Sequence, residues 1–396
     1  MATIAPIAVT TVADNESNPA GHRDLDTVLI KVASRCNINC SYCYVYNMGD
    51  TNWSRMEKFI SMETVDAIAD SLKLLSETQS TPFSIVLHGG EPLLLGEERL
   101  DYILATLRKH LSDKYSISIQ TNGVLISKPI LNICSKYQAN VAVSIDGPKL
   151  VHDKLRVNHK GEGTFEEVIK GIDELKSHPD STFLNSGLLA VIDPASDPKE
   201  VYSFFKQLNP PSVDFLYRDG NHTRLPAGKS AINSIEYGVW KSKLLEVYLS
   251  DPNPMPIRVL DDMLKVLLGG IVSKEGLGLT DFGIVIIDTD GTVMKNDTLK
   301  SSFDGADKFS NPINIKKSNL REFLNSVEFD EYRKMQRPSN PKCLSCPELN
   351  VCGGGMILHR WQDRNGFDNP SVYCSDQLYL INNMREAVSQ IIVTNE

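Results

Sequence analysis

The chain has 396 residues, with 41 Lys and Arg against 50 Asp and Glu, and therefore a formal net charge of −9. Hydrophobic residues make up 41% and charged residues 23%, a balance typical of globular proteins that excludes disorder, collagen and coiled coil. The length predicts two or three domains with a large core. Because phosphate backbones are bound mainly by Lys and Arg, the acidic balance predicts no nucleic-acid partner.

The sequence carries no signal for membrane insertion or export. No apolar run approaches the roughly 20 residues that span a bilayer. Residues 1–23 are mixed and polar, without the basic and apolar regions of a secretory signal. We therefore expect no membrane partner and a cytoplasmic location. Because the cytoplasm is reducing, the cysteines of this chain are interpreted as metal ligands or catalysts rather than disulfides.

Strands and helices alternate after a tail at residues 1–24, which we expect to be poorly ordered. The predicted strands are 25–33, 83–87, 116–120, 140–145, 185–192 and 213–217, and the helices between them are 62–75, 100–111, 128–137, 165–177 and 198–208. Such alternation predicts parallel strands with crossover helices. In folds of this kind the function lies at the carboxyl ends of the strands.

The second half of the chain has a less regular pattern. A polar loop at 218–234 is followed by predicted helices at 235–249 and 258–268. Residues 282–297 predict a hairpin that turns at Asp290 and Gly291, and residues 375–393 predict a C-terminal helix. The predicted division is therefore a tail at 1–24, a first domain at 25–234 and a second domain at 235–396.

Seven of the eight cysteines fall into two groups at short spacing. The N-terminal cysteine group is Cys36, Cys40 and Cys43, and the C-terminal cysteine group is Cys343, Cys346, Cys352 and Cys374. Zinc and iron–sulfur sites both need thiolates that converge from such loops. Structural zinc takes four ligands, so a group of three favours a [4Fe–4S] cluster with one open iron. Three buried apolar cysteines near a strand end are the alternative.

The pattern Cys36-x3-Cys40-x2-Cys43, with Tyr42 and Tyr44 around the last cysteine, resembles the signature of radical S-adenosylmethionine (SAM) enzymes. The resemblance implies a partial (β/α)6 TIM-like barrel over 25–234 and a [4Fe–4S] cluster whose fourth iron binds SAM. It implies that reductive cleavage of SAM gives a 5′-deoxyadenosyl radical that abstracts hydrogen. It further implies that Tyr42 lies beside the adenine and that an external electron donor of flavodoxin or ferredoxin type serves the enzyme.

The segment Gly89-Gly90-Glu91-Pro92 directly follows a predicted strand. Two glycines let a backbone approach a ligand closely, and a glutamate accepts hydrogen bonds from a cation. In the family this motif binds the methionyl amino group, so the resemblance assigns Gly89, Gly90 and Glu91 to SAM. The same segment elsewhere is often only a turn.

The stretch from Ser144 to Arg156 resembles its counterpart in anaerobic sulfatase-maturating enzymes, which implies that both residues contact the methionyl carboxylate. Arginine suits this role through its fixed fork of donors, although a surface arginine is the alternative. The resemblance also places Gln120 and Asn122, at the end of the third strand, near the ribose hydroxyls. Val191 is expected to pack on the adenine or in the barrel core.

The C-terminal cysteine group resembles that of the SPASM domain, which binds two auxiliary [4Fe–4S] clusters. This sequence departs from the pattern, because Asn296 and Met356 stand where it has cysteines. The four cysteines that remain imply one auxiliary [4Fe–4S] cluster, ligated entirely by thiolates. Such a cluster favours electron transfer or a structural role over substrate binding, and a structural zinc site is the alternative.

Candidate substrate-site residues follow the sixth strand and the hairpin. Asp297 resembles a base of the sulfatase-maturating enzymes, but hairpin ends also carry aspartate for turn chemistry. Asp219 and His222 lie in a stretch that resembles a segment of peptide-crosslinking members, and a solvated loop is the alternative. Cys134 lies in an apolar helix and is expected to be a core residue, which disfavours epimerisation that needs a cysteine hydrogen donor.

The leading hypothesis is a peptide maturase, because the reduced cysteine set resembles that of cyclophane-forming enzymes of ribosomal peptides. The resemblance implies a precursor-peptide partner, abstraction of a side-chain Cβ hydrogen, and carbon–carbon bond formation to an aromatic ring of the peptide. Thioether formation, epimerisation and small-molecule dehydrogenation are alternatives. Asn296 and Met356 disfavour sulfatase maturation, the net charge disfavours RNA modification, and a zinc-binding interaction module leaves the N-terminal cysteine group unexplained.

Overall fold

The computed structural model describes residues 24–394, so the predicted tail lies outside the described residues except for Asp24. Eight strands form one sheet in the order β6-β5-β4-β3-β2-β1-β7-β8. The strands are β1 (Thr27–Ala33), β2 (Ser84–Gly89), β3 (Ile117–Thr121), β4 (Ala139–Ser144), β5 (Asn185–Val191), β6 (Val213–Leu216), β7 (Ile284–Ile287) and β8 (Val293–Met294).

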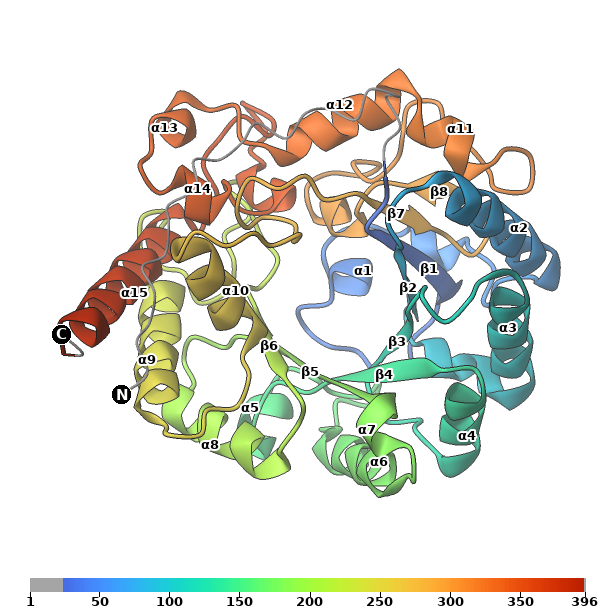
Figure 1. Ribbon diagram of the computed structural model, residues 1–396, viewed down its shortest axis with the longest axis horizontal. Coiled ribbons are helices and arrows are strands. Elements are labelled where there is room, and N and C mark those ends of the chain that lie inside the picture. Colours follow the sequence, from blue (N-terminus) through green and yellow to red (C-terminus); the bar gives the residue numbers. More distant parts are fainter. Residues whose placement is uncertain (1–23, 395–396) are drawn as a thin grey trace, which may run out of the picture.

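The first six strands pair in chain order, and every pair is parallel. The crossover helices are α2 (Met62–Thr78), α3 (Gly96–His110), α4 (Lys128–Lys136), α6 (Phe165–Ser177) and α8 (Pro198–Leu208). Figure 1 shows the sheet curving around a centre, with these helices outside the curve and α1 (Tyr44–Asn47) within it. This is the predicted partial (β/α)6 barrel, and all six strands and five helices of the prediction are confirmed.

Helix α2 shows why the crossover segments fold as they do. Its buried residues include Val65, Ile68, Leu72 and Leu75, which recur at helical spacing and turn one apolar stripe to the sheet. The side chain of Ser61 accepts a hydrogen bond of 3.1 Å from Thr64 N and so caps the first turn. Burial of that stripe, rather than helix propensity alone, holds the helix on the barrel.

The predicted hairpin at 282–297 is confirmed, since β7 and β8 pair antiparallel. The position of the hairpin beside β1 was not predicted. Strand β7 pairs in parallel with β1, from Thr27 opposite Ile284 to Ile30 opposite Ile287. The hairpin therefore extends the barrel sheet. The proposed domain division at residue 234 stays a prediction, but the sheet itself runs across it.

The remaining helices are α5 (Lys149–His152), α7 (Ser181–Leu184), α9 (Glu236–Ser250), α10 (Arg258–Leu267), α11 (Leu320–Leu324), α12 (Val327–Gln336), α13 (Pro341–Leu344), α14 (Leu349–Cys352) and α15 (Cys374–Thr394), with 3-10 helices η1 (Asn52–Ser54), η2 (Pro92–Leu95), η3 (Asp297–Ser301) and η4 (Ile357–Arg360). Among them, α7 packs beside the crossover helix α6, and the helices after β6 lie mainly beyond the two ends of the sheet (Figure 1). Helices α9, α10 and α15 confirm the predicted C-terminal helices. Within residues 24–394, no helix combines the length and apolar character needed to cross a membrane.

Helices α9 and α15 pack tightly at Gly238. A Cβ at this position would lie 2.8 Å from Asp376 Cα, so a larger residue would push the helices apart. The backbone N–H of Gly238 donates to Asp376 Oδ1 at 2.8 Å, and Lys229 pairs with the other carboxylate oxygen of Asp376 at 2.5 Å. This contact fixes the start of α15, and with it Cys374, against the barrel.

Candidate active site

A cavity of 350 Å³ lies at the carboxyl ends of the barrel strands, and both halves of the chain line it. All nine residues predicted to contact SAM are among its walls: Tyr42, Gly89, Gly90, Glu91, Gln120, Asn122, Ser144, Arg156 and Val191. The three residues of the N-terminal cysteine group line it as well. The structure therefore gathers at one place the residues that the sequence motifs singled out separately.

The N-terminal cysteine group sits on a tight loop after β1. Cys43 N donates to Cys40 O at 3.0 Å, and the side chain of Asn47 donates to the same carbonyl at 2.8 Å. Asn122 Nδ2 lies 3.7 Å from Cys36 Sγ. Burial raises the pKa of Cys36 to about 12 and of Cys43 to about 11, so a bound cation is needed to make these thiols thiolates.

The donor set of this loop suits a cluster better than one metal ion. Among residues 24–394, no three His, Cys, Asp or Glu side chains converge closely enough to hold a single ion. An iron–sulfur cubane makes a different demand, because each thiolate binds a different iron. Three soft ligands on one cavity wall therefore fit a [4Fe–4S] cluster, and Cys36, Cys40 and Cys43 would hold it.

Gly89, the last residue of β2, and Gly90 pack against the end of β1 and the start of the cysteine loop. Gly90 N donates to Ala33 O at 2.8 Å, and Glu91 N donates to Arg35 O at 2.9 Å. A Cβ on Gly90 would lie 2.3 Å from Arg35 O, and one on Gly89 would lie 2.1 Å from Ala33 O. The glycines are thus required for backbone packing between β2 and the loop, in addition to any ligand contact.

Glu91 braces two elements of the cavity wall. Its buried carboxylate accepts hydrogen bonds from Leu93 N at 2.9 Å, Thr121 Oγ1 at 2.7 Å and Asn122 N at 2.8 Å. Burial raises its pKa, which these three donors oppose. The carboxylate ties η2 to the end of β3.

Arg156 offers the cavity a free donor. Its Nη1 donates to Tyr42 Oη at 2.7 Å, and Tyr42 donates to Asp146 Oδ2 at 2.7 Å. Arg156 Nε is buried and has no hydrogen-bond partner among the described residues. Nearby, Gln120 donates to Ser144 Oγ at 2.9 Å, which leaves the serine hydroxyl proton available. An unsatisfied guanidinium nitrogen and a serine hydroxyl that line the same cavity fit a carboxylate such as that of SAM.

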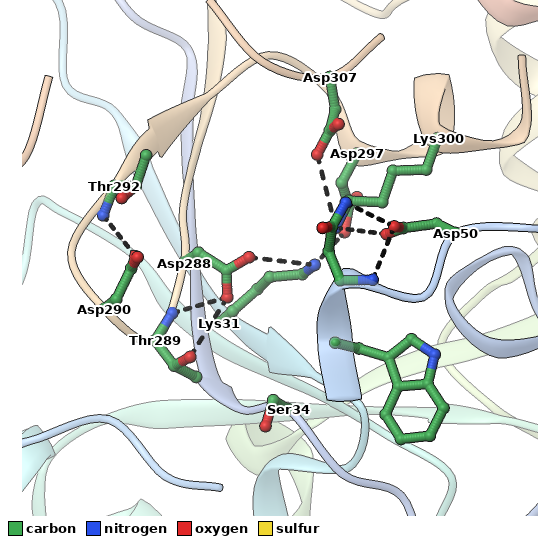
Figure 2. A network of polar contacts seen from close by, with 12 residues as sticks. Lys31, Ser34, Asp50, Asp288, Thr289, Asp290, Thr292, Asp297, Lys300 and Asp307 are labelled. Atoms are coloured by element: carbon green, nitrogen blue, oxygen red, sulfur yellow. Dashed lines mark hydrogen bonds and ion pairs between the residues drawn. The ribbon is translucent and has the colours of Figure 1, made fainter. Parts of the chain in front are cut away.

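Asp297 does not line the cavity, in contrast to its predicted place in the substrate site. It belongs to a buried charge network of Lys31, Asp50, Asp288, Asp297, Lys300 and Asp307 (Figure 2). Lys31 Nζ lies 2.8 Å from its carboxylate, and Tyr44 donates to it at 3.1 Å. Burial favours the neutral acid, but Lys31, His88 and Lys300 hold the pKa of Asp297 at about 2. A carboxylate so firmly ionised is a poor proton acceptor.

The network joins the barrel to the region after β7. Lys31 on β1 reaches Asp297 on η3 and, at 3.9 Å, Asp288 at the hairpin turn. Lys300 lies 3.2 Å from Asp50 and 3.4 Å from Asp307. Because these charges are buried, each is stable only while its ion-pair partner is present. The network therefore fixes η3 to β1.

His222 also lies off the cavity wall. Its Nε2 is 2.7 Å from Pro370 O, and its backbone N–H donates to Trp361 O at 3.0 Å. The side chain therefore ties the loop after β6 to the chain before α15. This position replaces the predicted contact with substrate.

Asp219 does line the cavity. It accepts no hydrogen bond and forms no ion pair with any residue of the 24–394 range. Burial in the cavity wall and the negative charge of Asp297 raise its pKa to about 7. A carboxyl group that titrates near neutral pH and faces a cavity is equipped to accept a proton.

The C-terminal cysteine group gathers from α13, α14 and the start of α15. Burial raises the pKa of Cys352 to about 12, and the negative charges of the other thiolates of the group add to this rise. Gly353, Gly354 and Gly355 follow it with φ of 64°, 83° and 69°, which only glycine adopts easily in succession. Cys352 alone of this group lines the cavity, which therefore extends from one cysteine group to the edge of the other.

The structure accounts for Asn296, which stands where the SPASM pattern has cysteine. Its side-chain oxygen accepts from Thr298 N at 3.1 Å and caps η3, and its amide donates to Glu275. Met356, the other departure, lines the cavity. Asn296 thus has a structural role that needs no metal.

Several residues of the cavity wall were not predicted from the sequence: Lys241, Lys274, Glu275, Thr298, His359 and Gln377. The glycine run after Cys352 was a signal for close packing at that point. Lys241 and Glu275 carried no motif, because a helix lysine and a loop glutamate are ordinarily solvated.

Comparison with known proteins agrees with this geometry. Residues 30–193 match the family described as the Radical SAM superfamily. The chain therefore contains a radical SAM domain, and its C-terminal region fits a SPASM-like extension. Radical SAM enzymes use a [4Fe–4S] cluster and SAM.

The similar proteins match most of the chain. A cysteine-type anaerobic sulfatase-maturating enzyme of Clostridium perfringens is 25% identical over 357 residues, covering 88% of this chain and 93% of that protein. The structure of native anSMEcpe with AdoMet and Cp18Cys peptide has a TM-score of 0.78 at 21% identity, covering 93% of this chain and 99% of that one. Streptococcus suis SuiB with its precursor peptide SuiA has a TM-score of 0.60 at 14% identity, covering 87% and 74%. At these identities the two structures support the fold.

Proposed function

We propose that the protein is a radical SAM maturase that forms a carbon–carbon crosslink to an aromatic residue in a ribosomally made precursor peptide. The observation that carries this proposal is the cavity, which joins the N-terminal cysteine group and the nine SAM-site residues to an unpaired carboxyl group, Asp219. The peptide-bound structures of anSMEcpe and SuiB support a peptide as the substrate class.

The residues divide into those that hold cofactors and those that serve the substrate. Cys36, Cys40 and Cys43 hold the first cluster, while Arg156 and Ser144 receive the carboxylate of SAM. The C-terminal cysteine group holds one auxiliary [4Fe–4S] cluster in the proposal. When bound, these cofactors supply the hydrogen-abstracting radical and an electron acceptor. The cavity walls position the peptide and exclude water.

Crosslinking removes two hydrogens from the peptide. One leaves the Cβ as a hydrogen atom, and the new carbon–carbon bond forms between that Cβ and a ring carbon. The second leaves the ring as a proton, while an electron passes to the acceptor, and the ring regains aromaticity. Asp219 is the proton acceptor in this proposal, because it faces the cavity unpaired, whereas Asp297 is committed to Lys31.

Oxidation of a cysteine or serine side chain, as in sulfatase maturation, is the second candidate. It is favoured by a sulfatase-maturating relative matched over 93% of its length. The substitution of Asn296 and Met356 for two expected cysteines favours the crosslinking proposal over it.

Mass spectrometry separates the two functions. The reconstituted protein is incubated anaerobically with SAM, reductant and either the Cp18Cys peptide or an aromatic-containing peptide from any short reading frame found beside its gene. Crosslinking predicts loss of two hydrogens with backbone fragmentation blocked between the joined residues and no reaction with an aminooxy reagent. An aldehyde product, trapped by that reagent and fragmenting normally, overturns crosslinking in favour of the second candidate.

Metal analysis tests the cofactor assignment separately. Two clusters predict about eight irons per chain after anaerobic reconstitution, four for each cubane. About four irons together with one zinc would instead assign the C-terminal cysteine group to zinc.

A further inference from the structure

Lys241 is a buried cation without a counter-ion. It lies on α9, is only 2% exposed and lines the cavity. Its Nζ lies 3.6 Å from the centre of the Tyr217 ring. Within residues 24–394 it forms neither a hydrogen bond nor an ion pair, so the ring face is its main polar contact.

The carboxylates around Lys241 are already paired with other cations. Asp214 on β6 lies 3.0 Å from Lys274 and 3.7 Å from Arg258. Asp376 on α15 pairs with Lys229 and caps Gly238. Of the other carboxylates at this end of the cavity, Asp262 lies 3.3 Å from Lys274 and Glu275 accepts a hydrogen bond from Asn296. None of these four carboxylates forms an ion pair with Lys241.

The other groups that face Lys241 do not compensate its charge. Burial, together with the charge of Lys241, lowers the pKa of His359 on η4 to about 3, so this imidazole is neutral. Burial also lowers the pKa of Lys241 itself to about 7, against the attraction of Asp214 and Asp376. An isolated buried ammonium is costly unless a partner arrives. A cation–π contact offsets only part of that cost.

We propose that Lys241 binds a carboxylate group of the substrate inside the cavity. The inference rests on the proposed function, because it takes the substrate to be a peptide that enters this cavity. Two sources of a carboxylate exist in a peptide, namely the C-terminus and an Asp or Glu side chain. SAM also occupies this 350 Å³ cavity in the proposal, so only a short part of the peptide enters it, and either source places the reacting residue close to the anchored group.

A titration of Lys241 by NMR tests the inference without turnover. Lysines of the protein are labelled biosynthetically with carbon-13 lysine before cluster reconstitution and addition of SAM, because Lys241 is buried and a chemical label would not reach it. The Lys241 signal is assigned by its loss in Lys241→Met and, should that variant fold poorly, in Lys241→Arg. Lys243→Met is the matched control, because Lys243 is an exposed lysine on the same helix.

Three small probes separate the possibilities at matched ionic strength. N-acetyl-alanine presents a C-terminal carboxylate, N-acetyl-aspartate N-methylamide presents only a side-chain carboxylate, and N-acetyl-alanine N-methylamide is neutral. We expect at least one carboxylate probe to raise the Lys241 pKa by one unit or more, a tenfold preference for the charged lysine. The neutral probe should leave it unchanged, and the more effective carboxylate identifies the source.

A Lys241 pKa that no carboxylate probe raises would overturn the inference, as would an equal rise with the neutral probe. Because the measurement requires no peptide conversion, failure of the crosslinking reaction does not affect its outcome. Conversely, a crosslinked product with an unresponsive Lys241 would retain the proposed function and remove only the carboxylate contact.

Discussion

Two buried polar regions of this protein are built on opposite principles. In the charge network, Lys31 and Lys300 each lie within 4 Å of two carboxylates (Figure 2). On the cavity wall, Lys241 and Asp219 have no ion-pair partner among the described residues. The pKa values follow this contrast, because Asp297 is held at about 2 while Asp219 is raised to about 7.

The contrast separates structural charges from functional ones. A buried pair that satisfies itself fixes two elements relative to each other, as Lys31 fixes η3 to β1. A buried group left unpaired at a cavity costs stability, and it is best explained by a ligand or a proton that completes it. The two regions should therefore respond in opposite ways to substitution, one in stability and the other in activity.

The largest effect is expected from substitution of a cysteine on the cavity wall. Cys36→Ala should abolish 5′-deoxyadenosine formation, because a cluster with two protein ligands no longer presents one open iron in place. Liquid chromatography of the reaction mixture measures the product. Cys134→Ala is the matched control, since Cys134 is buried in the core away from the cavity and should retain deoxyadenosine formation. Persistent deoxyadenosine in Cys36→Ala would disprove the cluster assignment.

The second prediction concerns Asp219. Asp219→Asn should slow peptide crosslinking by about 10²–10⁴-fold, the usual contribution of a general base, while deoxyadenosine still forms. In the native protein, crosslinking should rise as pH increases through about 7, because the carboxylate form accepts the proton. Rates of both products over pH 6–9 test this. Equal loss of deoxyadenosine and crosslink would contradict a role confined to the proton step.

Substitutions in the charge network should change the stability of the folded protein. Asp297→Asn leaves Lys31 with only the more distant Asp288 and should lower the free energy of unfolding by about 3–5 kcal/mol. Chemical denaturation of the reconstituted protein measures it. The double variant Lys31→Met/Asp297→Asn removes both charges and should recover much of that loss. No recovery in the double variant would mean that the pair itself is not what Asp297 stabilises.

The smallest net effect is expected at Lys241, because two contributions oppose each other. Lys241→Met removes an uncompensated buried amine but also its contact with the Tyr217 ring, and should raise the free energy of unfolding at pH 7 by about 1 kcal/mol. The folded-state pKa is about 7 and the unfolded value 10.5, so the native protein should gain stability as pH rises between them. Lys241→Met should lose that gain and Lys243→Met should keep it. A destabilised Lys241→Met would show that the amine has a partner in the folded protein.

Much of the barrel and half of the site were readable from local sequence. The apolar, β-branched run of 25–33 and the helical periodicity of 62–75 indicate burial, which each segment carries in its own residues. The cysteine spacing and the Gly-Gly-Glu segment likewise place ligands within a few positions of each other. The nine predicted SAM-site residues could be named for this reason, and the structure gathers all nine at the cavity.

Only the tertiary structure decided which charges are paired. Asp297 and Asp219 look alike in the sequence, yet Lys31, 266 positions before Asp297, pairs with one and not the other. The pairing of β7 with β1 and the place of Lys241 on the cavity wall are also contacts between distant segments. Residue type and spacing determine which side chains a local segment buries and which ligands it offers. The ion-pair partners of a charge depend instead on how distant segments pack, because Coulomb interactions act through space and not along the chain.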